Sequence, residues 1–137
     1  MDDNQIIHIL KTARTIAVVG LSSNPEKDSY PIAEYLQKQG YRIIPVNPTA
    51  QEILGEKVYP DLLSITEPVD VVQVFRPSEA VPPIVQQAIQ IKAKVVWLQS
   101  GITNAEAAEA GRAAGLEVVE DRCMRVDHRF LIGASKK

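Results

Sequence analysis

Five short runs of mainly apolar residues, rich in valine and isoleucine, recur along the chain at the spacing of one strand plus one helix. Runs that are apolar almost throughout, rather than alternating with polar residues, are typical of strands covered on both faces of a parallel sheet. We therefore predict strands at residues 15–20, 41–46, 69–75, 93–99 and 116–120.

The segments between these runs have the signals of helices. Apolar residues recur at near-helical spacing, and Gly40 and Gly115 stand where a glycine commonly ends a helix. Asn104 is the expected N-cap of the last of these helices. We predict helices at residues 32–39, 78–91 and 104–114, an amino-terminal helix capped by Asp2 or Asp3, and an irregular link with one small helix at 54–65.

Strands that alternate with helices through right-handed crossovers predict an α/β fold, a doubly wound sheet of five parallel strands with helices on both faces. We expect the strand order 3-2-1-4-5, which reverses direction between the first and fourth strands. Ligands of such sheets bind outside the carboxyl ends of the strands at the reversal. The loops after Gly20 and Gln99 should then face each other across a crevice.

Composition limits the size and class of the protein. The 137 residues, 45% of them hydrophobic, fit a single domain over 1–137. Fifteen basic and seventeen acidic residues give a net charge of −2 without a basic block, so nucleic acid is not an expected partner. The apolar runs have strand length and the amino terminus is acidic, which predicts a cytoplasmic protein with no membrane partner.

The first predicted strand ends at Gly20 in a polar loop that leads into the next helix. A helix amino terminus exposes free N–H groups and the positive end of its dipole, so an anion can bind at such a turn. Gly20 would let the backbone approach a ligand, Ser22 and Ser23 add hydroxyl groups, and Lys27 adds a charge for a phosphate. The alternative is that the glycine only closes the turn or lets the helix pack.

The known nucleotide motifs do not match this loop. Gly20 is the only glycine of a G-x-G-x-x-G pattern, and Asn47-Pro48 stands where an NAD site has an acidic residue. The segment from Gly20 to Lys27 is one residue too long for a Walker A motif, and the G-x-S-x-G of serine hydrolases lacks its closing glycine. These comparisons disfavour NAD, a nucleoside triphosphate and a serine hydrolase.

Three more strand ends bring polar or aromatic groups to the same edge of the predicted sheet. Arg76 would add a second cation, Phe75 an aromatic face for a base or a pantetheine-like chain, and Pro48 a flat apolar edge. The alternatives are a core position for Phe75, a solvated charge for Arg76 and an ordinary turn at Asn47-Pro48. The segments concerned are Asn47-Pro48, Phe75-Arg76 and Gln99-Ser100-Gly101.

Several blocks of the chain closely resemble, in the same order, the small stand-alone CoA-binding proteins. That family is related to the CoA-binding amino-terminal domain of the succinyl-CoA synthetase α subunit. The resemblance covers about residues 15–128 and implies a Rossmann-like sheet that binds coenzyme A or an acyl-CoA. The blocks are GLSSNPEKDSYPIAEYLQKQGYRIIPVNP, LGEKVYPDL, VDVVQVFRPSEAVPPIV, AKVVWLQSGITNAEAA and AAGLEVVEDRCMRVDH.

The resemblance also implies where coenzyme A binds, because in the synthetase its phosphates and adenine lie on the first strand-to-helix loop and the loops after strands two, three and four. Lys27 would be a phosphate partner. The residues matched in this chain are Gly20, Ser22, Ser23, Asn24, Pro25, Lys27, Asn47, Pro48, Phe75, Arg76, Gln99, Ser100 and Gly101.

Binding without catalysis is the function that we expect. The phosphorylated histidine and nucleotide-binding subunit of the synthetase lie outside the resembling domain, and we find no catalytic residue or metal site that replaces them. The chain would then be a non-catalytic CoA-binding module, a sensor or an accessory subunit of a protein partner. The alternatives are an enzyme acting on a CoA thioester, which would need a general base, and an interaction protein with an empty pocket.

Cys123 is the only cysteine, which excludes an internal disulfide and a multi-cysteine metal site. It lies close to two arginines that would stabilise a thiolate, so we hypothesise a mixed disulfide with coenzyme A. The alternative is a packed small hydrophobic residue. His8 and His128 are expected to be ordinary, partly exposed side chains rather than metal ligands, and Trp97 is expected in the core.

Overall fold

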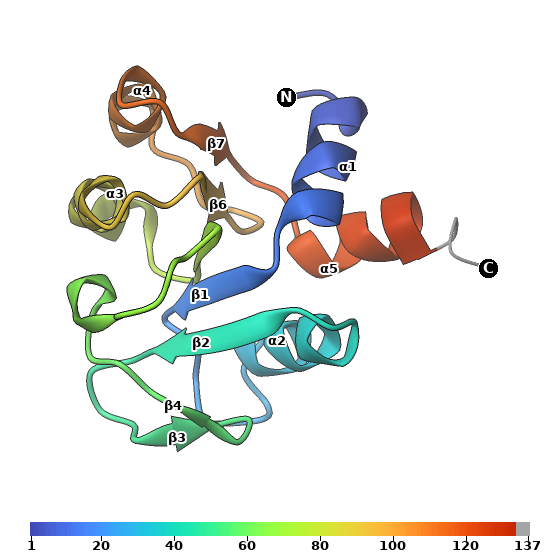
Figure 1. The fold of residues 1–137 in the computed structure, drawn as a ribbon, viewed down its shortest axis with the longest axis vertical. Coiled ribbons are helices and arrows are strands. Elements are labelled where there is room, and N and C mark those ends of the chain that lie inside the picture. Colours follow the sequence, from blue (N-terminus) through green and yellow to red (C-terminus); the bar gives the residue numbers. More distant parts are fainter. Residues whose placement is uncertain (134–137) are drawn as a thin grey trace.

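A computed structural model describes residues 1–133, which form a central sheet between two layers of helices (Figure 1). None of the helices in this range combines the length and the apolar composition that a membrane span requires. The elements in chain order are α1 (Asp3–Thr12), β1 (Thr15–Val19), α2 (Ser29–Lys38), β2 (Arg42–Val46), β3 (Glu52–Ile53), β4 (Glu56–Lys57), η1 (Leu62–Ser64), β5 (Val71–Val74), η2 (Ser78–Ala80), α3 (Val81–Gln90), β6 (Val95–Leu98), α4 (Ala105–Ala113), β7 (Glu117–Val119), α5 (Met124–Asp127) and η3 (His128–Ile132).

All five predicted strands are present and form one parallel sheet in the order β2-β1-β5-β6-β7. The helices α1, α2 and α5 lie on one side of this sheet and α3 and α4 on the other (Figure 1). The predicted α/β class, with five parallel strands and helices on both faces, is therefore confirmed.

The predicted strand order 3-2-1-4-5 is wrong, because the third main strand, β5, pairs with β1 instead of lying outside β2. Pro45 explains the difference. The Pro45 carbonyl points away from β1 and accepts from the Tyr59 N–H at 3.0 Å. The N–H and C=O of one strand residue point to the same side, so the donor that proline lacks is missing from this outer edge of β2. A strand paired to the outer edge of β2 would therefore lack one hydrogen bond at Pro45. β5 is buried along its whole length, which suits a position in the centre of the sheet.

The reversal of direction therefore lies between β1 and β5, not between β1 and β6. The loops that diverge from it are those after Gly20 and Phe75, rather than those after Gly20 and Gln99. The ligand site that the sheet topology favours therefore lies between the ends of β1 and β5, one strand away from the predicted position.

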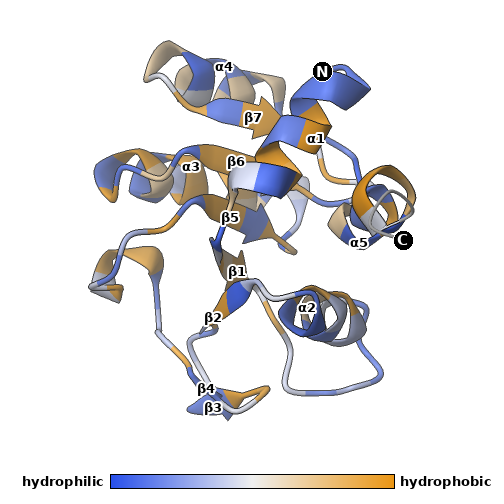
Figure 2. Ribbon diagram, turned by 45° about the vertical axis from the view of Figure 1, so that its right-hand side comes forward, coloured by the Kyte–Doolittle hydropathy of each residue, from blue (hydrophilic) through white to orange (hydrophobic). Residues whose placement is uncertain are grey.

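Each face of the sheet has its own hydrophobic cluster, and the strands supply both. Ile16 and Val18 of β1 face the side of α1 and α2, while Ala17 and Val19 face the side of α3. Trp97 is buried as expected, and its indole N–H donates to the Arg122 carbonyl at 2.8 Å. Hydrophobic residues are concentrated on the central strands in Figure 2.

The predicted helix caps are confirmed. The Asp2 carboxylate accepts from the Gln5 N–H at 2.9 Å, and the Asn104 side chain accepts from the Ala107 N–H at 2.9 Å. The predicted link has its small helix, η1, but the sequence reading missed the β3–β4 hairpin, which turns through Leu54 and Gly55 at positive φ.

His8 is exposed as predicted, but His128 is only 1% exposed, so the prediction for His128 is wrong. The chain after Cys123 forms α5 and η3, a helical segment that the sequence reading did not anticipate and that packs on α1 and α2. The His128 Nδ1 lies 2.9 Å from the Tyr35 hydroxyl, and the ring stands edge-on to Tyr35 and Tyr41.

Asp70 joins the starts of the two central strands, because one of its carboxylate oxygens accepts from the N–H groups of Arg14 at 2.8 Å and Thr15 at 3.0 Å. Burial acts to raise the pKa of Asp70. The two N–H groups and the Lys94 ammonium together outweigh that effect and hold the pKa below its usual value.

We predict that Asp70→Asn lowers the free energy of unfolding at pH 7 by about 1 to 2 kcal/mol, because hydrogen bonds to a charged acceptor become neutral ones. A lowered native pKa stabilises the fold above the unfolded value near about 4, and that stability is lost as the pH falls through the native pKa. Urea unfolding at pH 7 and about pH 3 should show the difference from wild type shrinking in acid. Lys94→Ala is the control with little effect, since that side chain is 78% exposed. An undiminished difference in acid would show that the charge is not its source.

Candidate functional site

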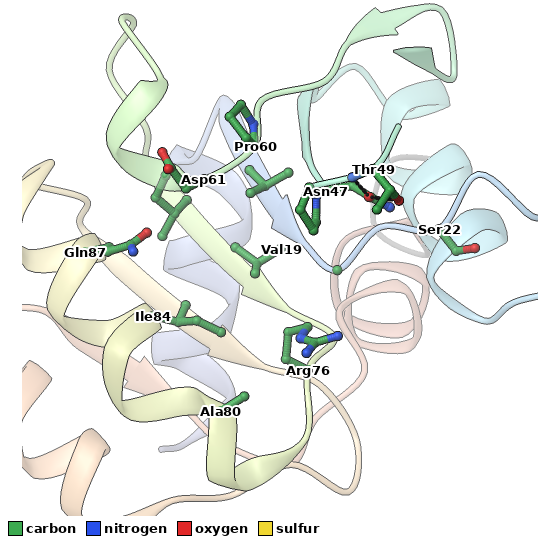
Figure 3. A pocket seen from close by; sticks show the side chains of 14 residues that line it. Val19, Ser22, Asn47, Thr49, Pro60, Asp61, Arg76, Ala80, Ile84 and Gln87 are labelled. Atoms are coloured by element: carbon green, nitrogen blue, oxygen red, sulfur yellow. Dashed lines mark hydrogen bonds between the residues drawn. The ribbon is translucent and has the colours of Figure 1, made fainter. Parts of the chain in front are cut away.

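A cavity of about 500 Å³ opens at the carboxyl ends of β1 and β2, beside the first turns of α3 (Figure 3). The strand ends and their loops form one wall, and the segment before η1 and the exposed side of α3 form the other. It is lined by Val19, Gly20, Ser22, Val46, Asn47, Pro48, Thr49, Pro60, Asp61, Leu62, Arg76, Ala80, Ile84 and Gln87.

Gly20 is the point at which the three strand ends come together. Its φ is +87°, and a Cβ on it would lie 2.9 Å from the Phe75 carbonyl oxygen and 3.1 Å from the Arg76 Cδ. Its N–H donates to the Val46 carbonyl at 3.0 Å. Only glycine fits this position, because both the backbone conformation and the space exclude a side chain.

The polar residues that follow Gly20 largely bond to one another. The Ser22 N–H donates to the Ser29 hydroxyl at 2.9 Å, and the Asn24 N–H donates to the Ser22 hydroxyl at 3.0 Å. The Asn24 side chain accepts from the Glu26 N–H at 3.0 Å. Ser22 and Asn24 therefore fix the shape of the loop.

The helix after this loop offers few free donors. Asp28, its N-cap, makes no capping hydrogen bond through its side chain. Of the first three residues of α2, Tyr30 donates its N–H to the Lys27 carbonyl at 3.0 Å, and Pro31 has no N–H. The first loop contributes only Gly20 and Ser22 to the cavity, while four predicted site residues, Ser23, Asn24, Pro25 and Lys27, are exposed and do not line it.

Asn47 links the loops after β1 and β2. Its amide nitrogen donates to the Leu21 carbonyl at 2.9 Å, and its Oδ1 accepts from the Thr49 N–H at 2.8 Å and the Thr49 hydroxyl at 2.9 Å. Both ends of the side chain are thus used within the protein. Asn47 shapes the cavity wall on which Pro48 and Thr49 lie.

Arg76 is the one basic residue that lines the cavity, and within residues 1–133 it has no carboxylate partner. In Figure 3 its side chain extends from the end of β5 toward the side where Ser22 and Thr49 lie. The acidic residue of the cavity, Asp61, accepts from the N–H of Ser64 at 2.9 Å and from its hydroxyl at 2.7 Å. The guanidinium is therefore available to an anionic ligand beside Gly20.

Apolar side chains form much of the remaining surface. Val19, Val46 and Leu62 are buried, and Ile84 is partly exposed on α3. Such a surface suits the flat face of a base. The sequence reading missed the wall made by Thr49, Pro60, Asp61, Leu62, Ala80, Ile84 and Gln87, because it placed β5 and the helix after it away from β1.

The other predicted residues lie elsewhere. Gly101 is exposed, has a φ of +82° and donates its N–H to the Asp121 carboxylate at 2.6 Å. Phe75, Gln99 and Ser100 line a second cavity of about 330 Å³, which we call the thiol-side cavity. Its other lining residues are Asp28, Ile32, Ile102, Cys123 and Arg125.

Comparison with known proteins gives a consistent family relationship. Residues 14–129 match the family described as "CoA binding domain". The Bacillus subtilis protein YneT is 41% identical over 124 residues, which is 90% of this chain and 92% of that protein. Acetate–CoA ligase (ADP-forming) II of Archaeoglobus fulgidus is 33% identical over 111 residues, but the match covers 78% of this chain and only 16% of the ligase.

Solved structures give the same result. A protein from Pyrococcus horikoshii superposes with a TM-score of 0.94 and 41% identity, covering 97% of this chain and 94% of that one. A protein from Thermus thermophilus superposes with a TM-score of 0.92 and 40% identity, covering 96% of this chain and 100% of that one.

We predict that Gly20→Ala is more destabilising than Gly115→Ala. Both positions have positive φ, so each alanine should cost about 1 to 2 kcal/mol in backbone strain. Only at Gly20 would the new Cβ also meet a backbone oxygen, whereas at Gly115 nothing lies within 4 Å. Urea unfolding of the two variants measures the difference directly. Equal losses would mean that the close approach of β1 and β5 is not constrained by the missing side chain.

Proposed function

The chain belongs to the CoA-binding domain family, and on that basis we propose that it binds coenzyme A or an acyl-CoA at the first cavity and catalyses no reaction on it. The observation that carries this proposal is the position of Arg76, which has no carboxylate partner among residues 1–133, beside Gly20 at the reversal of the sheet. Ligands of doubly wound sheets bind outside the strand ends at that point.

The chemistry of the cavity fits the nucleotide end of coenzyme A. Adenine would lie on the apolar surface that includes Val46, Leu62 and Ile84. The diphosphate would lie next to Gly20, with Arg76 as its cation, because a guanidinium binds phosphate through charge-assisted hydrogen bonds. Asp61 stands at the opposite wall, away from the strand ends (Figure 3), so it need not oppose the phosphates.

A binding role agrees with the side chains around the cavity. Among residues 1–133 the lining includes no histidine, cysteine or lysine, and its one carboxylate, Asp61, has Oδ1 bonded to both polar groups of Ser64. A general base acts within hydrogen-bond reach of the proton that it removes, and Asp61 stands at the wall opposite Arg76 (Figure 3). The relatives that carry a similar segment within much longer chains are named as acetate–CoA ligases, which supports a module that contributes CoA binding to a larger activity.

The protein would then be a sensor of coenzyme A or an accessory subunit whose partner protein supplies the chemistry. We propose a location in the cytoplasm, where CoA thioesters are made and used. The competing proposals are an enzyme acting on a CoA thioester and an interaction protein whose cavity is empty. Turnover of acetyl-CoA or succinyl-CoA by the purified protein would support the enzyme.

Calorimetric titration of ligand-stripped protein with coenzyme A, NAD and ATP tests the proposal. Selective binding of coenzyme A is expected, and no binding of any of the three would instead favour the interaction protein.

We predict that Arg76→Ala weakens coenzyme A binding about 10- to 150-fold, the loss expected for one charge-assisted phosphate contact. Arg76→Lys should weaken it less, because it keeps the charge but not the fork of donors. Lys27→Ala tests the other candidate phosphate partner. Its loss of affinity for coenzyme A should be smaller, because Lys27 does not line the cavity. Lys38→Ala, at the far end of α2, is the control for net charge. Calorimetry on all four variants gives the comparison, and an unchanged affinity for Arg76→Ala would remove Arg76 from the site.

A further inference from the structure

The thiol-side cavity lies mainly on the α2 face of the sheet and the first cavity on the α3 face, although Ile102 of the thiol-side cavity packs with the cluster under α3. Ile32, Phe75 and Cys123 pack with the hydrophobic cluster under α1 and α2, while Ile84 packs with the cluster under α3. The two cavities approach each other at consecutive residues, since Phe75 lines one and Arg76 lines the other. A long ligand that crosses the sheet edge at the reversal would therefore reach both.

At this edge the end of β5 is bonded to the end of β1, next to Gly20. The Phe75 N–H donates to the Val19 carbonyl at 2.9 Å, and the Phe75 carbonyl is the atom that a Cβ on Gly20 would meet. Because position 20 has no side chain, the end of β1 packs directly against Phe75 and Arg76, the consecutive residues that line the two cavities. Coenzyme A has the required form, with a nucleotide at one end of a flexible pantetheine arm and a thiol at the other.

Gln99 provides a buried polar group at the thiol-side cavity. The residue is 4% exposed, and its Oε1 accepts from the Met124 N–H at 2.9 Å and from the Gln73 amide nitrogen at 3.0 Å. A backbone N–H can only donate, so the atom that faces it must be the oxygen. The orientation of the Gln99 amide is therefore fixed by the fold.

This orientation leaves the Gln99 Nε2 as a donor without an acceptor among residues 1–133. The one fully buried side-chain atom without a partner in that range is Gln73 Oε1, so the Gln99 Nε2 keeps some accessible surface in the cavity that Gln99 lines. A donor that the protein leaves unpaired at the surface of a cavity is available to an acceptor of a bound ligand. The pantetheine arm carries two amide carbonyls that can serve as that acceptor.

Cys123 lines the same cavity and is partly buried. Arg125 also lines it and has no carboxylate partner in the described part of the chain. Since no other cysteine exists in the sequence, no internal thiol can displace a group attached to this sulfur.

We propose that Cys123 is a reversible modification site for the disulfide of coenzyme A. The proposal rests on the proposed function, because the nucleotide end would be held in the first cavity. The Cys123 thiolate attacks one sulfur of the CoA disulfide, the bond between the two CoA sulfurs breaks, and a bond between Cys123 and one CoA forms. The second CoA leaves as a thiolate and takes up the proton that Cys123 released, so no further oxidant is required. The Gln99 Nε2 donates to an amide carbonyl of the bound arm.

Mass spectrometry of the intact, reduced protein after mixing with disulfides tests this inference. The probes are CoA disulfide, pantethine, which lacks the nucleotide, and oxidised glutathione. We expect an adduct of one CoA on Cys123, formed at least tenfold faster with CoA disulfide than with oxidised glutathione. Cys123→Ser, which keeps the size and suits its N-cap position, should form none.

Two variants connect the rate to the two cavities. Arg76→Ala should slow the reaction with CoA disulfide to the rate seen with pantethine and leave the pantethine rate unchanged. Gln99→Glu keeps the acceptor for Met124 and Gln73 but removes the donor. Its carboxylate also disfavours the Cys123 thiolate for every reagent, so each rate is divided by that of oxidised glutathione, and this ratio should fall for both CoA disulfide and pantethine.

Equal rates for the three disulfides, or no adduct with any, would overturn the inference. If calorimetry still shows coenzyme A binding in that case, the modification site fails and the proposed function stands. If coenzyme A does not bind at all, the proposed function itself is refuted, and the inference that rests on it is refuted with it.

Discussion

The parallel pairing of β1 with β5 determines where every other part of this molecule lies. It places the reversal of the sheet at Gly20, sends the chain after β1 to one face and the chain after β5 to the other, and so divides the helices into two layers. Asp70 holds the strands together at their starts and the glycine allows their close approach at their ends. Both cavities result from the same pairing, because residues that follow β1 and residues that follow β5 line each of them.

The five strands of the main sheet, the helices as far as α4 and the fold class could be predicted from the sequence, because they depend on local patterns such as apolar runs, caps and terminal glycines. The strand order could not be predicted from those patterns, because the residues of a strand buried on both faces do not indicate which strand lies beside it. Pro45 was the available signal, because a residue without an N–H inside a strand favours an edge. With β2 at the edge, the third main strand cannot lie outside it, and the place of β5 beside β1 brings α3 to the wall of the cavity.

The sequence patterns predict that Gly20, Asn47 and Arg76 lie at one edge of the sheet, and these residues line the first cavity, but the roles of individual residues were harder to infer. Ser22, Asn24 and Asn47 have the side chains expected of ligand contacts, yet their polar atoms bond to neighbouring backbone or side chains. Residue type alone does not distinguish a group that binds a ligand from one that shapes a loop, because both need donors and acceptors near a turn. His128 illustrates the same limit, since its burial depends on a helix that returns from the end of the chain to pack on α1 and α2.

The outer edge of β2 has a further consequence for a module of this kind. An open edge strand is a template for pairing with any other extended chain, and a proline, a charged residue and a covering segment are recognised ways of preventing it. Here Pro45 withholds a donor, and Arg42 is held at the strand start by ion pairs with Glu56 and Glu67. Tyr59 pairs with the Pro45 carbonyl and the Asn47 N–H at the end of the strand. That edge of the sheet is thereby protected against aggregation. The fold can therefore be produced at high concentration or next to other domains without β2 pairing with strands of another copy or domain.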